Sequence, residues 1–545
     1  MGFTKGKAMS IVSRLRKQVA SWKQKGKDRG IEARYERRQR IRIAKERDNL
    51  KKENKRLKSR IKELESENRG LPVKNKATLI FLAFMLFFVA CISFRAVGRV
   101  LTILAPYLGI QKAPCTQTII NWTTRLSMVR IGSTLEMELP PLPLSPFSNG
   151  LIWIIDISIG LGDGKILTVL GLDARHHQLE QSAPGLEHVH CLAVSVAVSW
   201  TGEAVADLLK RLIAVKGRPA AYLKDGGTEL RKAVRLLNEQ GIGSPSIDDI
   251  SHDCANLLKR EYHDHPRFET FLSSCGRFSG KVKQTILACL APPKVQTKAR
   301  FMNVHRLVIW AERLLKLSPV GRARKGSILS KLRECMDILP SCKALIKRFK
   351  EDASNLLKCQ EILKTGGLSH DTLAKCEPFI ESIPTAAVRI RFAASLQERL
   401  EIAKRLGLNE VGLPISSDVI ESLFGKAKQH GIGEIKDADR IAIHIPALCG
   451  VPTLTEAEQV LGISVAEQNE FADNTSSLTR QRRQLLKNTE PDRLESLQDA
   501  QSNAHIELIP RAKNRAKNGE DSLVPVYYEN TSCPDLKWRS RGQSP

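Results

Sequence analysis

LIWIID, residues Leu151–Asp156, is apolar at every position except its last. A run of this kind is typical of a strand in the middle of a domain, covered on both faces of its sheet. A turn over 159–165 and a second apolar run, Ile166–Leu172, follow it, so the two runs predict a hairpin. Asp156 would end the first strand, and a strand end is a rigid place to hold a metal ligand.

The hairpin begins a longer alternation of strands and helices. Further strands are predicted at Val189–Trp200, Ala220–Leu223 and Ile247–Ile250, and helices at 202–215, Thr228–Gln240 and Asp253–Glu261. The ribonuclease-H-like (RNase-H-like) fold has this order: three strands in series, then a helix, then alternating strands and helices. We therefore predict an α/β core with a mixed sheet flanked by helices.

An all-helical insertion is predicted to interrupt this core. From about 262 to 405 the sequence is rich in Leu, Lys and Arg and has no clear strand pattern. Ser416-Ser417-Asp418 then begins a helix, Val419–Lys428, which we expect to return to the sheet.

The chain is strongly basic, with a formal net charge of +28 over 545 residues. Residues 1–62 alone contain 23 Lys and Arg against 6 Asp and Glu, a surplus of 17. This asymmetry predicts a basic amino-terminal arm and a polyanionic partner, either nucleic acid or an anionic membrane.

Within this arm, apolar residues recur every seven positions. One seam position holds Ile43, Leu50, Leu57 and Leu64, and the other holds Asn54, Ile61 and Asn68. A heptad repeat with Asn in its seam favours a parallel two-stranded coiled coil, and a basic helix that continues into such a zipper can bind double-stranded DNA. We predict a homodimer or higher oligomer on DNA. The alternative is a solvated charged helix whose leucines are accidental.

Ala77–Phe94 contains 18 residues without a charge, which is the lower limit for a helix that spans a membrane. We favour a buried helix, Leu79–Ile92, at the start of a small helical domain, because no second run of this kind follows. The twelve Cys include no C-x-x-C pair, which fits reduced thiols. We expect a cytoplasmic, nucleoid-associated protein without a membrane partner.

A helix-turn-helix is predicted next. A helical piece over Arg95–Leu104, a turn at 107–110 and a second helix over Thr116–Met128 have the order of that motif. The residues expected to face a DNA groove are the polar ones of the second helix: Thr116, Gln117, Thr118, Asn121 and Arg125. An ordinary helical hairpin is the alternative.

Four prolines within residues 139–149 predict a linker and a domain boundary. The predicted domains are a basic arm with a short coiled coil (1–72), a helix-turn-helix domain (76–138), a catalytic domain (150–445) and a helical, largely disordered basic tail (446–545).

Three carboxylates are candidates for metal-dependent phosphodiester chemistry, which needs hard oxygen ligands for two divalent ions. Asp156 ends the first strand, Asp225 ends the fourth strand, and Glu421 lies on the helix after the insertion. Each also has a structural explanation. Asp156 and Asp225 could be turn residues, and Asp418-x-x-Glu421 has the spacing of a capping box.

Four segments resemble the blocks of DDE transposases of bacterial insertion sequences. They are 151–172 with Asp156, Leu223–Leu230 with Asp225, Asp249–Lys259, and Ser416–Lys428 with Glu421. The resemblance covers roughly 76–450. It implies an RNase-H-like core, two Mg²⁺ ions (with Mn²⁺ as a substitute) at the three carboxylates, hydrolysis at the ends of a mobile element, and attack of the freed 3′-hydroxyl on target DNA. The 196 positions between Asp225 and Glu421 suit the group with a helical insertion, but they leave the choice of Glu421 over Glu410 or Glu434 to the motif.

Other residues have weaker signals. His252 could contact a phosphate or orient an oxygen, Trp310 could stack on an unpaired base, and Lys426 and Lys428 could hold phosphates. Core packing or simple solvation would also explain these residues. Four zinc-compatible side chains match no standard finger spacing: His263, His265, Cys254 and Cys275.

The sequence thus favours a DDE transposase that binds the ends of its own element. Two alternatives remain, a nuclease of the same fold without strand transfer and a non-catalytic DNA-binding regulator.

Overall fold

The computed structural model describes residues 5–67, 75–137, 139–145, 148–158, 164–294, 300–317, 322–430, 438–472 and 506–509. The chain divides into two compact units, each described here by itself. The first contains residues 1–78 and 102–113, and the second contains 79–101 and 114–545.

The first unit contains one long helix, α1 (Lys5–Glu67), of 63 residues. Three residues of the predicted heptad seam, Ile43, Leu50 and Leu57, are each more than half exposed. The side chains of Ile61 and Leu64, and Asn68 as a whole, lie outside the described residues. A regular apolar seam open to solvent on a helix of this length is what a coiled-coil strand presents to its partner. Pairing with a second copy remains a prediction.

The uncharged run Ala77–Phe94 does not form one continuous helix. It is divided between α2 (Lys76–Phe84), a π-helical turn η1 (Met85–Val89) and the start of α3 (Phe94–Leu108). The ring of Phe87 stacks on that of Phe94 at 4.0 Å, so the chain folds back on itself here. No helix within the described ranges is both long and apolar enough to cross a membrane.

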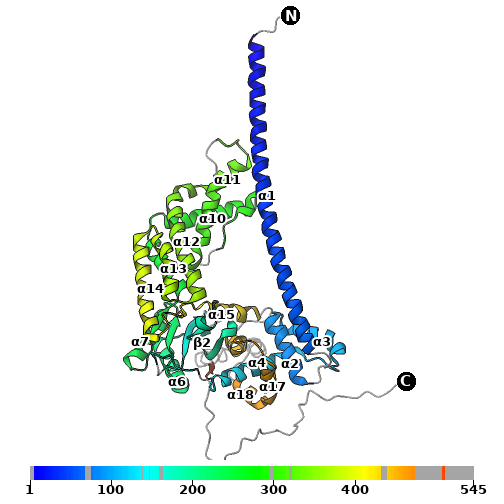
Figure 1. The fold of residues 1–545 in the computed structure, drawn as a ribbon, viewed down its shortest axis with the longest axis vertical. Helices are drawn as coiled ribbons and strands as arrows, with labels where there is room; N and C mark the ends of the chain where they lie inside the picture. The colour runs from blue at the N-terminus through cyan, green and yellow to red at the C-terminus, as the bar shows by residue number, and fades with distance from the viewer. Residues whose placement is uncertain are drawn as a thin grey trace, which may run out of the picture. The chain divides into compact units, whose positions relative to one another are not determined.

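A six-stranded mixed sheet is the centre of the second unit (Figure 1), with the order β5-β4-β1-β2-β3-β6. The strands are β1 (Leu151–Ser158), β2 (Lys165–Asp173), β3 (Val189–Ala197), β4 (Ala221–Lys224), β5 (Ser246–Asp248) and β6 (Ile506–Leu508). β1, β2, β3 and β6 pair antiparallel, whereas β4 runs parallel to both β1 and β5. The first five strands occur where the sequence predicted them.

Both faces of β1 are buried, which explains its unbroken apolar run. Leu151, Trp153 and Ile155 face α6 (Gly202–Lys216) and α7 (Thr228–Glu239). Ile152 and Ile154 face the larger core on the other side of the sheet, to which α8 (Ile250–Tyr262) and α15 (Asp418–His430) contribute. Since side chains alternate along a strand, Asp156 points to the same face as Ile152 and Ile154.

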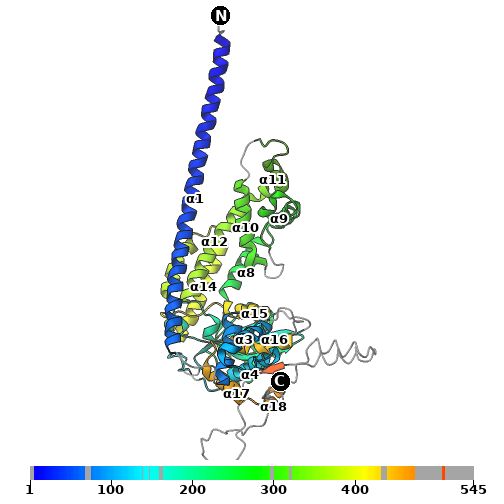
Figure 2. The ribbon, with the colours of Figure 1, turned by 90° about the vertical axis from the view of Figure 1, so that its right-hand side faces the viewer.

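The helical insertion lies between α8 (Ile250–Tyr262) and α15 (Asp418–His430). Its helices are α9 (Phe268–Val282), α10 (Arg300–Leu317), α11 (Ile328–Met336), α12 (Lys343–Gly366), α13 (His370–Glu381) and α14 (Ala386–Leu406). α8 packs against α10, α12 and α14, and Figure 2 shows these helices side by side. The described residues of 262–405 form helices and contain no named strand, in agreement with the predicted helical pattern.

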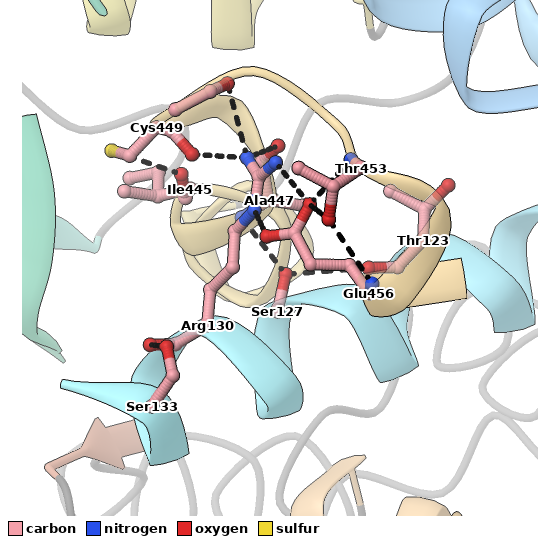
Figure 3. A network of polar contacts seen from close by, with 10 residues as sticks. Thr123, Ser127, Arg130, Ser133, Ile445, Ala447, Cys449, Thr453 and Glu456 are labelled. Carbon is pink, nitrogen blue, oxygen red and sulfur yellow. Dashed lines mark hydrogen bonds and ion pairs between the residues drawn. The ribbon is translucent and has the colours of Figure 1, made fainter. Parts of the chain in front are cut away.

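The helix α4 (Thr116–Ser133) belongs to the core of the second unit (Figure 3). The guanidinium of Arg130 is buried, pairs with Glu456 at 2.7 Å and donates hydrogen bonds to the carbonyls of Ala447 and Cys449. The Ser127 hydroxyl accepts a hydrogen bond from the Ala447 amide. These contacts attach α4 to the segment that follows the catalytic candidates, including η5 (Pro446–Leu448) and α17 (Leu454–Gly462).

The remaining short elements complete the second unit. They are α5 (His176–Leu179), η2 (Leu186–His188), η3 (Ile286–Leu290), η4 (Leu339–Cys342), α16 (Ala438–His444) and α18 (Val465–Ala472). The sequence did not predict β6. Part of the tail expected to be largely disordered forms β6, whose Leu508 is buried where the strand extends the sheet beside β3.

We expect Arg130→Ala to lower the free energy of unfolding by about 3 kcal/mol, because Glu456 and two buried carbonyls lose their partner. Denaturant unfolding of the full chain measures this, with Lys210→Ala on the exposed face of α6 as control. Equal stability of the two variants would show that the Arg130 network contributes nothing.

Candidate active site

Asp156 and Asp225 are neighbours because β1 and β4 pair in parallel. The register places Ile155 opposite Lys224, and one further residue along each strand brings Asp156 beside Asp225. Each carboxylate also accepts a local amide hydrogen bond: Asp156 from Ile157 at 2.7 Å, and Asp225 from Gly227 at 3.0 Å. Asp156 lies two residues before the end of β1, not at its end as predicted, whereas Asp225 directly follows β4. The two carboxylates therefore lie together near the carboxyl ends of adjacent strands.

Gly226, directly after Asp225, leaves room for other side chains beside the two carboxylates. A Cβ at Gly226 would lie 2.9 Å from Nη2 of Arg231 and 3.6 Å from the amide nitrogen of Asn256. The absence of a side chain thus allows one cation and one amide to pack beside the Asp225 turn.

The electrostatics of Asp156 show that the site is acidic and partly desolvated. Burial, together with the nearby charges of Asp225 and Glu421, raises the pKa of Asp156 to about 7. The Ile157 amide and the imidazole of His252 act in the opposite direction. The charges of Asp225, Glu421 and His252 therefore all lie within electrostatic range of Asp156.

Glu421 and His252 form the other half of the site. Glu421 lies in the first turn of α15, His252 lies in the first turn of α8, and Nε2 of His252 is 3.5 Å from Oε1 of Glu421. The contact with Glu421 raises the pKa of His252 to about 9, while His252 lowers the pKa of Glu421. In this arrangement the imidazole is positively charged at neutral pH.

Side chains of the insertion hold α15 and α8 in place. Lys364, near the end of α12, pairs with Asp418 at 2.5 Å, and Asp418 begins α15. Arg399 of α14 pairs with Asp253 of α8 at 3.0 Å and also donates to the carbonyl of Asp248. The sequence did not single out Lys364 or Arg399, because both act across long sequence separations.

Of the two alternatives that the structure describes, Glu421 and not Glu410 acts on the pKa of Asp156. Glu410 pairs with His370 at 2.8 Å and is mostly exposed. Glu434 lies outside the described residues.

The donor set suits a hard divalent cation. Asp156 and Asp225 offer adjacent carboxylate oxygens, and the raised pKa of Asp156 reflects negative charge that a cation would compensate. Within the described part of the chain, no three His, Cys, Asp or Glu side chains are close enough together to hold an ion as they stand. Glu421, engaged by His252, would have to turn toward the two aspartates to become a third ligand.

The predicted DNA-contacting residues of α4 fall into two groups. At its first turns Gln117 is exposed and donates to Asn121 at 2.9 Å, and Thr116 and Thr118 are half-buried. Arg125 lies farther along, where Nε donates to Gln468 at 2.7 Å. Only the amino-terminal end of α4 is therefore open to a ligand, and DNA contact by these residues remains a prediction.

The remaining candidates of the sequence are Trp310, the two lysines of α15 and the cysteines of the zinc alternative. The Trp310 indole donates to the carbonyl of Leu290 at 2.9 Å and packs edge-on against Phe278. Lys426 is exposed and Lys428 half-buried on α15, beyond Glu421. The cysteines of the zinc alternative, Cys254 and Cys275, are buried, and burial raises their thiol pKa values.

Comparison with known proteins adds little to this geometry. No family model matches the chain, and no curated protein matches it. Among solved structures it is similar to a chain of the Drosophila P element transposase strand transfer complex, with 10% sequence identity and a TM-score of 0.38. That similarity covers 72% of this chain and 97% of the other.

We expect Asp156→Asn to stabilise the metal-free protein at pH 8 by about 1–3 kcal/mol. The folded-state pKa of about 7 lies above the unfolded value, so ionising Asp156 costs stability as pH rises from 4 to 7, and the amide removes that cost. Thermal unfolding in chelator measures the change, with the exposed Asp207→Asn as control. A lower melting temperature for Asp156→Asn than for the control would contradict the assignment.

His252 should titrate near pH 9 in the metal-free protein, by NMR of ¹³C-labelled histidine. Because its folded pKa is raised, the pair with Glu421 contributes stability below pH 6.5 that is lost as pH rises through 9. Glu421→Gln should bring the pKa back toward its ordinary value. An unchanged titration in that variant would show that the two side chains do not interact.

Proposed function

We propose that this chain is a DDE-type transposase with an RNase-H-like catalytic core. It would bind the ends of a mobile DNA element, hydrolyse phosphodiester bonds there, and join the 3′-hydroxyl ends to target DNA. Asp156, Asp225 and Glu421 would be the ligands of two divalent ions.

One observation carries this proposal: two carboxylates on adjacent parallel strands have a third within electrostatic range of Asp156, on a helix that follows a long helical insertion. The antiparallel β1-β2-β3 meander with β4 and β5 added in parallel supports the RNase-H-like assignment.

The protein's own groups suit a phosphate backbone. The protonated His252 would place positive charge beside Glu421, and Arg231 lies next to the Asp225 turn. Lys426 is exposed on the helix that carries Glu421. Outside the site, the basic helix α1 would supply sequence-independent attraction to DNA.

Bound divalent cations would activate the attacking oxygen and stabilise the leaving one. The chain itself contributes rigidity, because Asp156 and Asp225 are fixed by the pairing of their strands and by local amide hydrogen bonds. Rigid placement of charged groups around a reacting phosphate is where such catalysis gains most of its rate.

The DNA that flanks the gene is first searched for inverted repeats. The test is a strand-transfer assay with Mg²⁺ on DNA that carries those repeats. Joined product is expected from the unaltered chain. Asp225→Ala should abolish cleavage, by at least about 1,000-fold, while binding the same DNA with unchanged affinity. The exposed Asp207→Ala is the matched control and should remain active.

The other outcomes separate the alternatives. Cleavage without joining would favour a nuclease of the same fold, and binding without cleavage would favour a regulator. Full cleavage by Asp225→Ala would contradict the assignment of the carboxylates.

A further inference from the structure

Asp249 joins two helices that lie on opposite sides of the insertion in sequence. It is 1% exposed and lies between β5 and α8. Oδ1 accepts a hydrogen bond from the amide of His252 at 2.9 Å, and Oδ2 accepts one from the amide of Ser417 at 2.6 Å. The first amide belongs to the start of α8 and the second directly precedes α15.

The backbone around Asp249 makes the same connection. The Asp249 amide donates to the carbonyl of Lys224 at 2.8 Å, the residue before Asp225. The Ile250 amide donates to the carbonyl of Ile415 at 3.0 Å. Two consecutive residues therefore link the segments that carry Asp225, His252 and Glu421.

Helix capping alone does not account for this arrangement. A cap needs one oxygen, and hydroxyl caps serve elsewhere in the chain, as Ser327 does for α11. Asp249 uses both oxygens, each on a different helix, and among the side chains only a carboxylate offers two acceptor oxygens. Asp249 is also a buried carboxylate near a site that already contains three carboxylates. Burying a further acid is unfavourable, and a hydroxyl cap would avoid that cost.

We propose that Asp249 is a positioning residue: one carboxylate that clamps the amino-terminal ends of α8 and α15, and thereby fixes His252 and Glu421 against Asp225. The proposal rests on the proposed function for its effect on rate. The clamp itself is a property of the fold. Without it, α15 would still be held by its buried apolar side chains, such as Ile420, and by the pair of Lys364 with Asp418, but no single side chain would link its start to that of α8.

The test uses Asp249→Ser in the full chain. Serine can still cap α8 but has no second oxygen for Ser417, so the variant removes the bridge and keeps the cap. Asp249→Asn, whose amide nitrogen cannot accept a hydrogen bond, is the second variant in case the serine variant does not fold. Ser327→Ala, which loses only a remote cap, is the control.

Hydrogen exchange read by mass spectrometry reports the clamp without DNA or metal. Peptides over the start of α15 should exchange about tenfold faster in Asp249→Ser, while peptides over α17 keep the rate of the unaltered chain. In strand transfer, kcat should fall about 100-fold with KM for DNA unchanged, because Glu421 is displaced rather than DNA binding weakened.

Unchanged exchange at α15 would overturn the clamp. Faster exchange with the kcat of the Ser327→Ala control would overturn the positioning role and leave a structural one. If the unaltered chain shows no metal-dependent chemistry, the proposed function fails, and with it the effect on rate. The exchange experiment still decides the clamp.

Discussion

The parallel pairing of β1 with β4 is the constraint on which the rest of the site depends. It places Asp156 and Asp225 side by side at one edge of the sheet, and the burial of β1 on both faces keeps that edge rigid. Burial and then the neighbouring charge of Asp225 disfavour an ionised Asp156, which raises its pKa. A carboxylate perturbed in this way is typical of a functional site, and a bound cation would offset the negative charge.

Strands β1 to β5 could be predicted from the sequence because their patterns are local. The apolar run of β1, the hairpin to β2 and the Asp225-Gly226 turn are each visible within a few residues. Glu421 was identified only through a resemblance, because 196 positions separate it from Asp225 and its spacing also fits a helix cap. The pairs that hold it, such as Lys364 with Asp418, join segments that no local pattern connects.

Two further differences have the same physical origin. The polar residues of α4 were predicted to face DNA as one set, but Arg125 donates a hydrogen bond to Gln468 within the protein, whereas Gln117 is exposed. Polar residues that are satisfied internally look the same in a sequence as polar residues exposed for a ligand. Likewise, β6 is three residues long, and only the open edge of β3 makes it a strand.

If Asp156, Asp225 and Glu421 hold divalent metal together, Mn²⁺ soaked into crystals of the protein can be located there by anomalous scattering. Two peaks are expected, about 4 Å apart, with Asp156 and Asp225 as ligands and the Glu421 carboxylate turned away from His252 toward them. An absence of Mn²⁺ between the two aspartates, or Glu421 still paired with His252 beside a bound ion, would contradict this shared metal site.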